Sequence, residues 1–202
     1  MSIKTILLMI GIVIAVSFFA GCAKVPQADM DAANAALSAA KEAEADRYLP
    51  EEFKAVQDSH NAAMTEIENQ KSKFALTRNF KNAATLLQDA TKKANELKEK
   101  VAPRKEEVKA EVQKLMTDVK AAQAEAKSLM KKAPKGKEGR AALQAIQIEL
   151  NAAETSFSEV PTLINNGDFL TAKDKASAAL QKVQSINQEL KQAIAKRSGV
   201  KR

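Results

Sequence analysis

Apolar or small residues recur from Met30 onward at spacings that alternate between three and four, in six successive segments. This average period of 3.5 is typical of helices that pack against neighbours through one stripe of side chains, which we call the seam. No segment shows the alternating β-branched pattern of a strand, so the chain is predicted to be all-α. The first three seams are Met30, Ala33, Leu37, Ala40 and Glu44; Phe53, Val56, His60, Ala63, Ile67, Gln70 and Phe74; and Phe80, Ala83, Leu87, Ala90, Ala94, Leu97 and Val101. The last three are Val108, Val112, Leu115, Val119, Ala122, Ala126, Leu129 and Ala133; Leu143, Ile146, Leu150, Ala153, Phe157, Val160 and Ile164; and Phe169, Ala172, Ala176, Ala179, Val183, Ile186, Leu190 and Ala193.

Turn-forming and capping residues separate these segments. Pro50 suits the first turn of a helix, and Asn79 and Asp168 suit N-caps. The stretches 134–137 and 165–167 contain the proline, glycines and asparagines that break helices. The breaks and seams together predict six helical segments.

The seams of the two halves superimpose when 89 or 90 is added to the residue number. Phe53 corresponds to Leu143, and Phe80 corresponds to Phe169. A repeat of pattern with a period of about 90 residues predicts two copies of one supersecondary unit. We therefore expect two tandem three-helix, up-down-up, coiled-coil-like bundles, at 29–102 and 103–197.

The seam slips by four residues where the two copies join. The seam stops after Val101 and resumes at Val108 with its positions shifted by four residues, and Pro103 lies at this slip. Proline removes a helical hydrogen bond, so the third and fourth segments form either one kinked helix or two separate helices. The join holds no glycine or polar turn cluster, which favours the kinked continuous helix, a layout that resembles the spectrin repeat.

Short motifs add two local resemblances. Asn79-Phe80-x-x-Ala83 and Gly167-Asp168-Phe169-x-x-Ala172 resemble the second helix of tetratricopeptide-like repeats. The run 48–53, Tyr-Leu-Pro-Glu-Glu-Phe, is similar to alanine-rich helical domains of bacterial envelope lipoproteins. Both resemblances imply a helical interaction module.

The N-terminus has the parts of a secretory signal peptide: Lys4, then 16 apolar or small residues from Thr5 to Ala20. The run Phe19-Ala20-Gly21-Cys22 resembles the lipobox of bacterial lipoproteins, with Phe19 where that family usually has leucine. The resemblance implies cleavage between Gly21 and Cys22, diacylation of the Cys22 thiol, palmitate among its acyl groups, and acylation of the new amino terminus.

Two other interpretations of this segment stay open. The apolar run is close to the length of about 20 residues that a membrane span needs, so it suits an uncut anchor. In the other interpretation, the segment is a plain signal peptide and Cys22 is an ordinary cysteine that follows it. Under the lipoprotein interpretation, 1–21 is the signal peptide, 22–28 a lipidated tether and 198–202 a basic tail. Ala23 and Lys24 lack the aspartate that retains enteric lipoproteins at the inner membrane, which implies the periplasmic face of the outer membrane.

Residues suited to catalysis or to metal binding are sparse. His60 is the only histidine, which excludes the paired Glu-x-x-His motifs of a di-iron bundle and favours a core role for this side chain. Lys135-Gly136-Lys137-Glu138-Gly139 lacks the spacing of a phosphate loop, and Ser59 and Asp58 point away from His60 on one helix. We predict a protein that is not an enzyme and has no cofactor or metal.

The formal net charge is +7, and two basic clusters contribute to it. The lysines and arginines are either solvated loop residues or contacts to anionic phospholipid, lipopolysaccharide or cell-wall groups. Export and the scarcity of aromatic side chains for stacking, at 4% of residues, disfavour nucleic acid as a partner. The first cluster is Lys131, Lys132, Lys135, Lys137 and Arg140, and the second is Lys196, Arg197, Lys201 and Arg202.

Two kinds of function fit this chain. One is a lipid-anchored structural or protein-interaction scaffold, bound to another envelope protein or to the cell wall. The other is a periplasmic carrier of a small apolar ligand between helices. Many seam residues are alanine, which lets helices approach closely but buries little area, and this composition favours the scaffold.

Overall fold

The computed structural model describes residues 24–199, without the side chains of 137–138 and 197–198. Every regular element in this range is a helix, and no strand occurs in it, which confirms the all-α prediction. No helix within the range is both long enough and apolar enough to cross a membrane. The run 19–22 that resembles a lipobox lies outside the described residues.

The chain divides into two compact units between Ala102 and Pro103. Helix α5 (Lys81–Lys132) contributes to both units and contains Pro103. The third and fourth predicted segments are therefore one helix, as the absence of turn residues at the join indicated.

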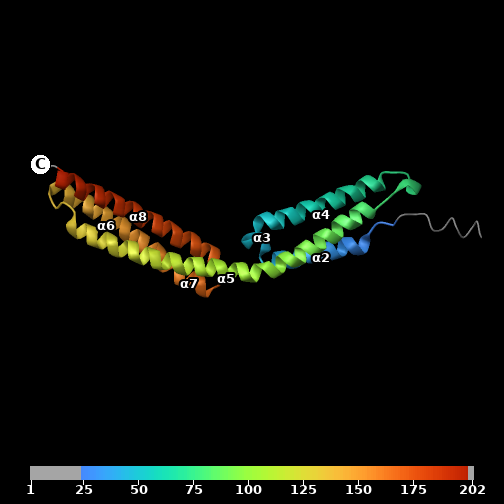
Figure 1. Ribbon diagram of the computed structural model, residues 1–202, viewed down its shortest axis with the longest axis horizontal. Coiled ribbons are helices and arrows are strands. Elements are labelled where there is room, and N and C mark those ends of the chain that lie inside the picture. Colours follow the sequence, from blue (N-terminus) through green and yellow to red (C-terminus); the bar gives the residue numbers. More distant parts are fainter. Residues whose placement is uncertain (1–23, 200–202) are drawn as a thin grey trace, which may run out of the picture. The chain divides into compact units, whose positions relative to one another are not determined.

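The first unit contains α2 (Gln27–Glu42), α3 (Ala45–Tyr48), α4 (Pro50–Lys71), the short 3-10 helix η2 (Ala75–Thr77) and the first part of α5. Figure 1 shows that α2, α4 and α5 run in alternating directions within this unit. Their seams meet in one core. That core contains Ala33 of α2, Ala63 and Ile67 of α4, and Phe80, Ala83 and Leu87 at the start of α5.

The connection between α2 and α4 differs from the predicted pattern. The first seam extended to Glu44, but α2 ends at Glu42, and Glu44 has a left-handed backbone with φ of 70°. Residues other than glycine adopt this backbone conformation at a cost in free energy. At Glu44 the left-handed backbone ends α2 and redirects the chain into α3 (Ala45–Tyr48). The turn places Ala45 and Tyr48 in the interior, positions that the periodicity did not predict.

The second unit contains the rest of α5, α6 (Lys137–Ser158), α7 (Val160–Asn165) and α8 (Phe169–Gly199). Its core joins Ala122 and Ala126 of α5 to residues of the other two long helices. Those residues are Leu150 and Ala153 of α6, and Val183, Ile186 and Leu190 of α8. The fifth predicted segment is divided at Glu159, because Pro161 starts a new short helix in its first turn.

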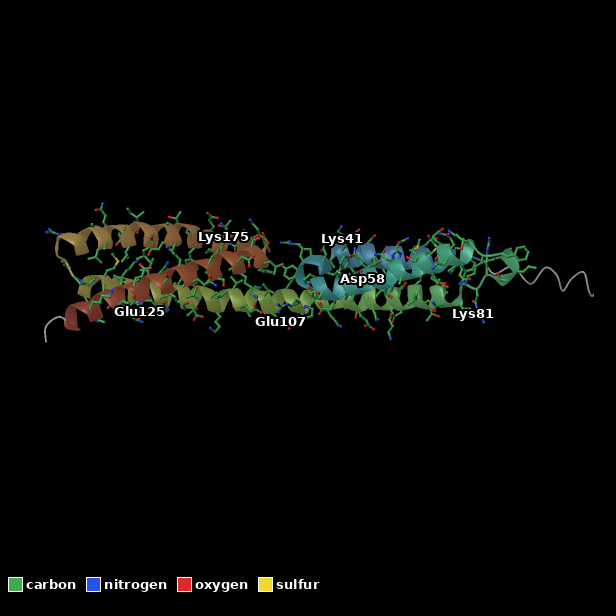
Figure 2. All side chains as sticks on the ribbon, turned by 90° about the horizontal axis from the view of Figure 1, so that it is seen from above. Lys41, Asp58, Lys81, Glu107, Glu125 and Lys175 are labelled. Atoms are coloured by element: carbon green, nitrogen blue, oxygen red, sulfur yellow. The ribbon has the colours of Figure 1, made fainter. Side chains whose placement is uncertain are left out.

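Polar contacts link α5 and α8 in this unit. The buried Asn187 of α8 donates from Nδ2 to the Ala122 carbonyl oxygen of α5 at 3.0 Å and to Glu125 Oε2 at 3.1 Å. Glu125, which is labelled in Figure 2, also pairs with Lys191 of α8 at 2.7 Å. A directional contact from a buried amide favours one relative position of two helices over the alternatives.

The turn between α7 and α8 has the geometry of a Schellman motif. Gly167 has φ of +78°, its N–H donates to the Ile164 carbonyl at 3.0 Å, and the Asp168 N–H donates to the Leu163 carbonyl at 2.9 Å. Glycine adopts a positive φ without the steric cost of a Cβ atom. Asp168 then lies immediately before α8, at the predicted N-cap position.

Burial follows the predicted seams closely. All seven residues of the third seam, from Phe80 to Val101, are buried. Two seam positions near helix ends are wrong, because Phe74 is 71% exposed and Ala193 is exposed. Phe74 lies beyond the end of α4 at Lys71, where a helical period no longer applies.

Candidate functional site

The predicted basic cluster lies at the turn between α5 and α6. Lys131, Lys132 and Lys135 line an open depression of about 540 Å³, together with Ala133, Pro134 and Gly136. All three lysines are exposed. The structure therefore brings three of the predicted cations together around one concave surface, which we call the basic turn.

The remaining two predicted cations follow on α6. Arg140 is exposed, and its backbone N–H donates to the Gly136 carbonyl at 2.9 Å. The side chain of Lys137 is not described. A Cβ atom at Gly139 would lie 2.3 Å from the Pro134 carbonyl oxygen, so the turn approaches the helix too closely for any other residue.

One further cation adjoins the basic turn and was not predicted. Lys127 lines a neighbouring depression of about 480 Å³ with Met130, Lys131, Lys135 and Gln147. Its Nζ pairs with Glu154 of α6 at 2.8 Å. The spacing of four residues between Lys127 and Lys131, which places both on one helix face, is the sequence signal that could have found it.

The second predicted basic cluster is only partly described. Lys196 is exposed near the end of α8, while the side chain of Arg197 and residues Lys201 and Arg202 lie outside the described part. Gly21 and Cys22 also lie outside it. Among the predicted sites, the basic turn is therefore the one whose arrangement the described residues give.

His60 lies on α4 and is half-buried. No group among the described residues forms a hydrogen bond with its buried Nε2 atom. The neighbouring Asp58 accepts a bond from Lys54 at 2.8 Å instead of orienting the imidazole. The described residues also contain no group of three or more His, Cys, Asp or Glu side chains placed to hold a metal ion.

No family model, curated protein or solved structure matches the chain.

Another depression lies over α4 and α5 in the first unit. Val56 and Leu97 contribute apolar surface to it, and Lys93, Glu96 and Lys100 line it as well. Its volume is about 280 Å³ and it is open to solvent. A small ligand here would lie against charged side chains as well as apolar ones.

A charge cluster joins α5 and α8 in the second unit. The Glu111 carboxylate accepts a hydrogen bond from Lys173 of α8, and it lies 3.4 Å from Arg104 Nη1. Arg104 also pairs with Glu107 at 2.9 Å. The bond from Lys173, followed by the positive charges of Lys173 and Arg104, holds the pKa of Glu111 below its ordinary value of 4.5.

The buried Nε2 atom of His60 leads to a first prediction. His60→Leu replaces a buried nitrogen without a partner by apolar surface, so it should raise the free energy of unfolding by about 1–2 kcal/mol. Urea denaturation measures this change. Asn61→Leu, at an exposed neighbouring position, is the control and should change stability little. A loss of stability in His60→Leu would show that the imidazole makes a stabilising contact.

The Glu111 contact leads to a second prediction. Lys173→Met removes the hydrogen bond and the nearest positive charge, so the pKa of Glu111 should rise toward its ordinary value. Because the fold lowers this pKa, the contribution of Glu111 to stability is present above pH 4.5 and is lost as pH falls through the folded-state pKa. Titration of the side-chain carboxyl by carbon-13 NMR measures the shift.

Lys175→Met is the matched control for this substitution. Lys175 lies on the same helix, but it pairs with Glu159 at 2.7 Å, so its removal should leave the Glu111 titration unchanged. An identical Glu111 pKa in the wild type and in Lys173→Met would contradict the assignment.

Proposed function

We propose that this protein is a non-catalytic envelope lipoprotein, anchored by acyl chains on Cys22, whose helical units bind another envelope protein. The lipobox-like run 19–22 supports the anchor. By the same resemblance, Ala23 and Lys24 favour the outer membrane, with the helical units in the periplasm. The packed helical cores support a role in which the units present a rigid surface.

One observation carries the scaffold proposal: α6 has an apolar stripe on its exposed face. Ala141, Ala145, Ile148 and Ala152 follow one another at spacings of four, three and four, and all are exposed. Ile148 is 62% exposed. These positions share one face of the helix, and the small alanines beside a single large side chain suit the close approach of a partner helix.

A carrier of an apolar ligand has weaker support. The depression over Val56 and Leu97 is open and has charged groups at its edge. Apolar ligand sites usually bury most of the ligand surface. The apolar stripe on α6 favours a protein partner instead.

Binding to an anionic surface is a second candidate function, favoured by the basic turn. Three exposed lysines around one depression provide a local positive field on one side of the turn. Lipopolysaccharide phosphates and acidic cell-wall groups carry the complementary charge. This activity is compatible with a scaffold role, because the basic turn and the α6 stripe use different residues.

Lipidation gives the third prediction. Intact mass of the protein extracted from membranes should show loss of residues 1–21 and the added mass of acyl chains. Cys22→Ser removes the acceptor thiol, so the acyl mass should be lost. An uncut amino terminus in the wild type would contradict the lipoprotein proposal and favour the membrane anchor.

Partner binding through α6 gives the fourth prediction. A photo-crosslinking amino acid at Ile148 should yield a discrete adduct with one envelope protein in intact cells. The same group at Gln188, an exposed position on α8, is the control and should not yield this adduct. Ala145→Glu would place a charge in the stripe and should remove the adduct at 148. Equal adducts at 148 and 188 would contradict a specific face.

The basic turn gives the fifth prediction. Replacing Lys131, Lys132 and Lys135 together by glutamine should weaken binding to purified lipopolysaccharide by about 3 kcal/mol, or about a hundredfold, at about 1 kcal/mol for each lysine near an anionic surface. The control replaces the exposed Lys92, Lys98 and Lys120 by glutamine, with the same loss of charge. Equal weakening in both variants would indicate a response to net charge alone.

A further inference from the structure

The connection between α4 and α5 exposes two large apolar side chains. Phe74 is 71% exposed and Leu76 is 70% exposed, on either side of the first residue of η2. We call residues 72–80 the apical loop. Two large exposed side chains two residues apart on a small loop are candidates for contact with an apolar partner.

The apical loop has a defined conformation that presents these side chains. Arg78 donates from Nε to the Lys73 carbonyl at 3.0 Å and from Nη2 to the Lys71 carbonyl at 2.8 Å. The Thr77 N–H and hydroxyl both donate to the Phe74 carbonyl at 2.9 Å. The bonds from Arg78 join the two sides of the loop, so its fold holds Phe74 and Leu76 outside the core.

A buried amide fixes the base of the loop. Gln70 is 6% exposed; its Oε1 accepts from the Asn79 N–H at 3.0 Å and its Nε2 donates to Glu66 at 2.6 Å. Asn79 Oδ1 in turn accepts from the Lys81 N–H at 3.0 Å and caps α5. The apical loop is therefore tied to α4 and α5 at both ends.

The apical loop lies at the same end of the first unit as the start of α2. Val25 packs against the core cluster that includes Ile67 and Phe80. Lys24 and Pro26 line an open depression of about 430 Å³ together with Arg78, Asn79, Phe80, Lys81 and Ala84. Figure 1 shows the start of α2 and the α4–α5 connection at one end of the unit, and Figure 2 labels Lys81 there.

The apical loop and the adjoining start of α5 are basic, while at their edges Lys71 pairs with Glu68 of α4 at 2.8 Å and Asp29 of α2 accepts a bond from Gln88 at 3.1 Å. No aspartate or glutamate occurs between Asn69 and Gln88, whereas Lys71, Lys73, Arg78 and Lys81 lie in that stretch. Lys24 lines the same depression as Arg78 and Lys81. Apolar side chains surrounded by cations are typical of protein surfaces that lie in the interface of an anionic bilayer.

We propose that the apical loop contacts the bilayer that holds the Cys22 lipid, with Phe74 and Leu76 among the lipid chains and the surrounding cations against anionic headgroups. The proposal rests on the lipidation proposed above. Cys22 precedes Lys24 by two residues, a separation that extended chain spans in at most about 7 Å. The acyl chains therefore bring this end of the unit to the membrane surface, where the loop forms a second contact that fixes the orientation of the unit.

The experiment uses tryptophan as a local probe, because the natural chain contains none. Phe74→Trp is made in the full chain, extracted from membranes and reconstituted into phosphatidylethanolamine–phosphatidylglycerol vesicles with brominated acyl chains. Tryptophan emission should shift to shorter wavelength and lose intensity through contact with bromine. Leu76→Trp provides a second probe and should respond in the same way.

Ile148→Trp is the matched control, because Ile148 is also a large exposed apolar residue and lies on α6. Its emission should be neither shifted nor quenched in the same vesicles. Lys73→Glu in the Phe74→Trp chain should reduce the quenching, whereas Lys98→Glu, at an exposed position on α5, should not.

The possible failures give different signals. Unquenched emission from Trp at both 74 and 76, in protein that carries the acyl mass, would overturn the loop contact and leave the lipidation proposal intact. A blue shift without bromine quenching would show that a second copy of the chain covers the loop, and would overturn the bilayer contact as well. Absence of the acyl mass from the protein extracted from membranes would overturn the lipidation proposal, whatever the tryptophan emission shows.

Discussion

Close approach of helices through alanine is the constraint on which both units depend. Ala33, Ala63 and Ala83 have no exposed surface, and they come from α2, α4 and α5 of the first unit. Alanine removes little area from water, so each such residue contributes less hydrophobic stabilisation than a leucine would. Its small size allows the larger residues Ile67 and Leu87 to be fully enclosed by neighbouring helices, and interiors packed to this density tolerate little added volume.

The polar contacts have a different role, since they act mainly where the helices end or need a fixed position. Asn187 bonds across to α5, Gln70 holds the base of the apical loop, and Gly167 ends α7. These contacts determine where the loops lie on otherwise regular helices. The apical loop is positioned in this way, whereas the basic turn is constrained by the close approach of Gly139 to the Pro134 carbonyl oxygen.

The sequence predicted the helical interiors well because a period of 3.5 depends only on which side chains face a neighbour. Leu87 and Ile186 are fully buried for that reason. The period does not specify where a helix stops, so it wrongly extended the second seam to Phe74 and the first to Glu44. It also could not predict that Asn187, a polar residue beside the seam, is buried, because its partner belongs to a helix 62 to 65 residues away in the chain.

The candidate sites were predicted to different extents. Consecutive lysines at a proline-glycine break identified the basic turn, although the contribution of Lys127 needed the helix geometry. The apical loop was not predicted, because its conformation depends on bonds from Arg78 to the backbone of residues several positions earlier. Such contacts have no periodic signature.

The most direct test of the account is the effect of volume at one seam alanine. Ala63→Leu adds a side chain at a position with no exposed surface, whereas Ala62→Leu adds the same side chain at its exposed neighbour. Close seam packing predicts that Ala63→Leu lowers the free energy of unfolding by about 1–3 kcal/mol in urea denaturation, while Ala62→Leu changes it little. Equal stability of the two variants would contradict the claim that close approach through alanine holds the unit together.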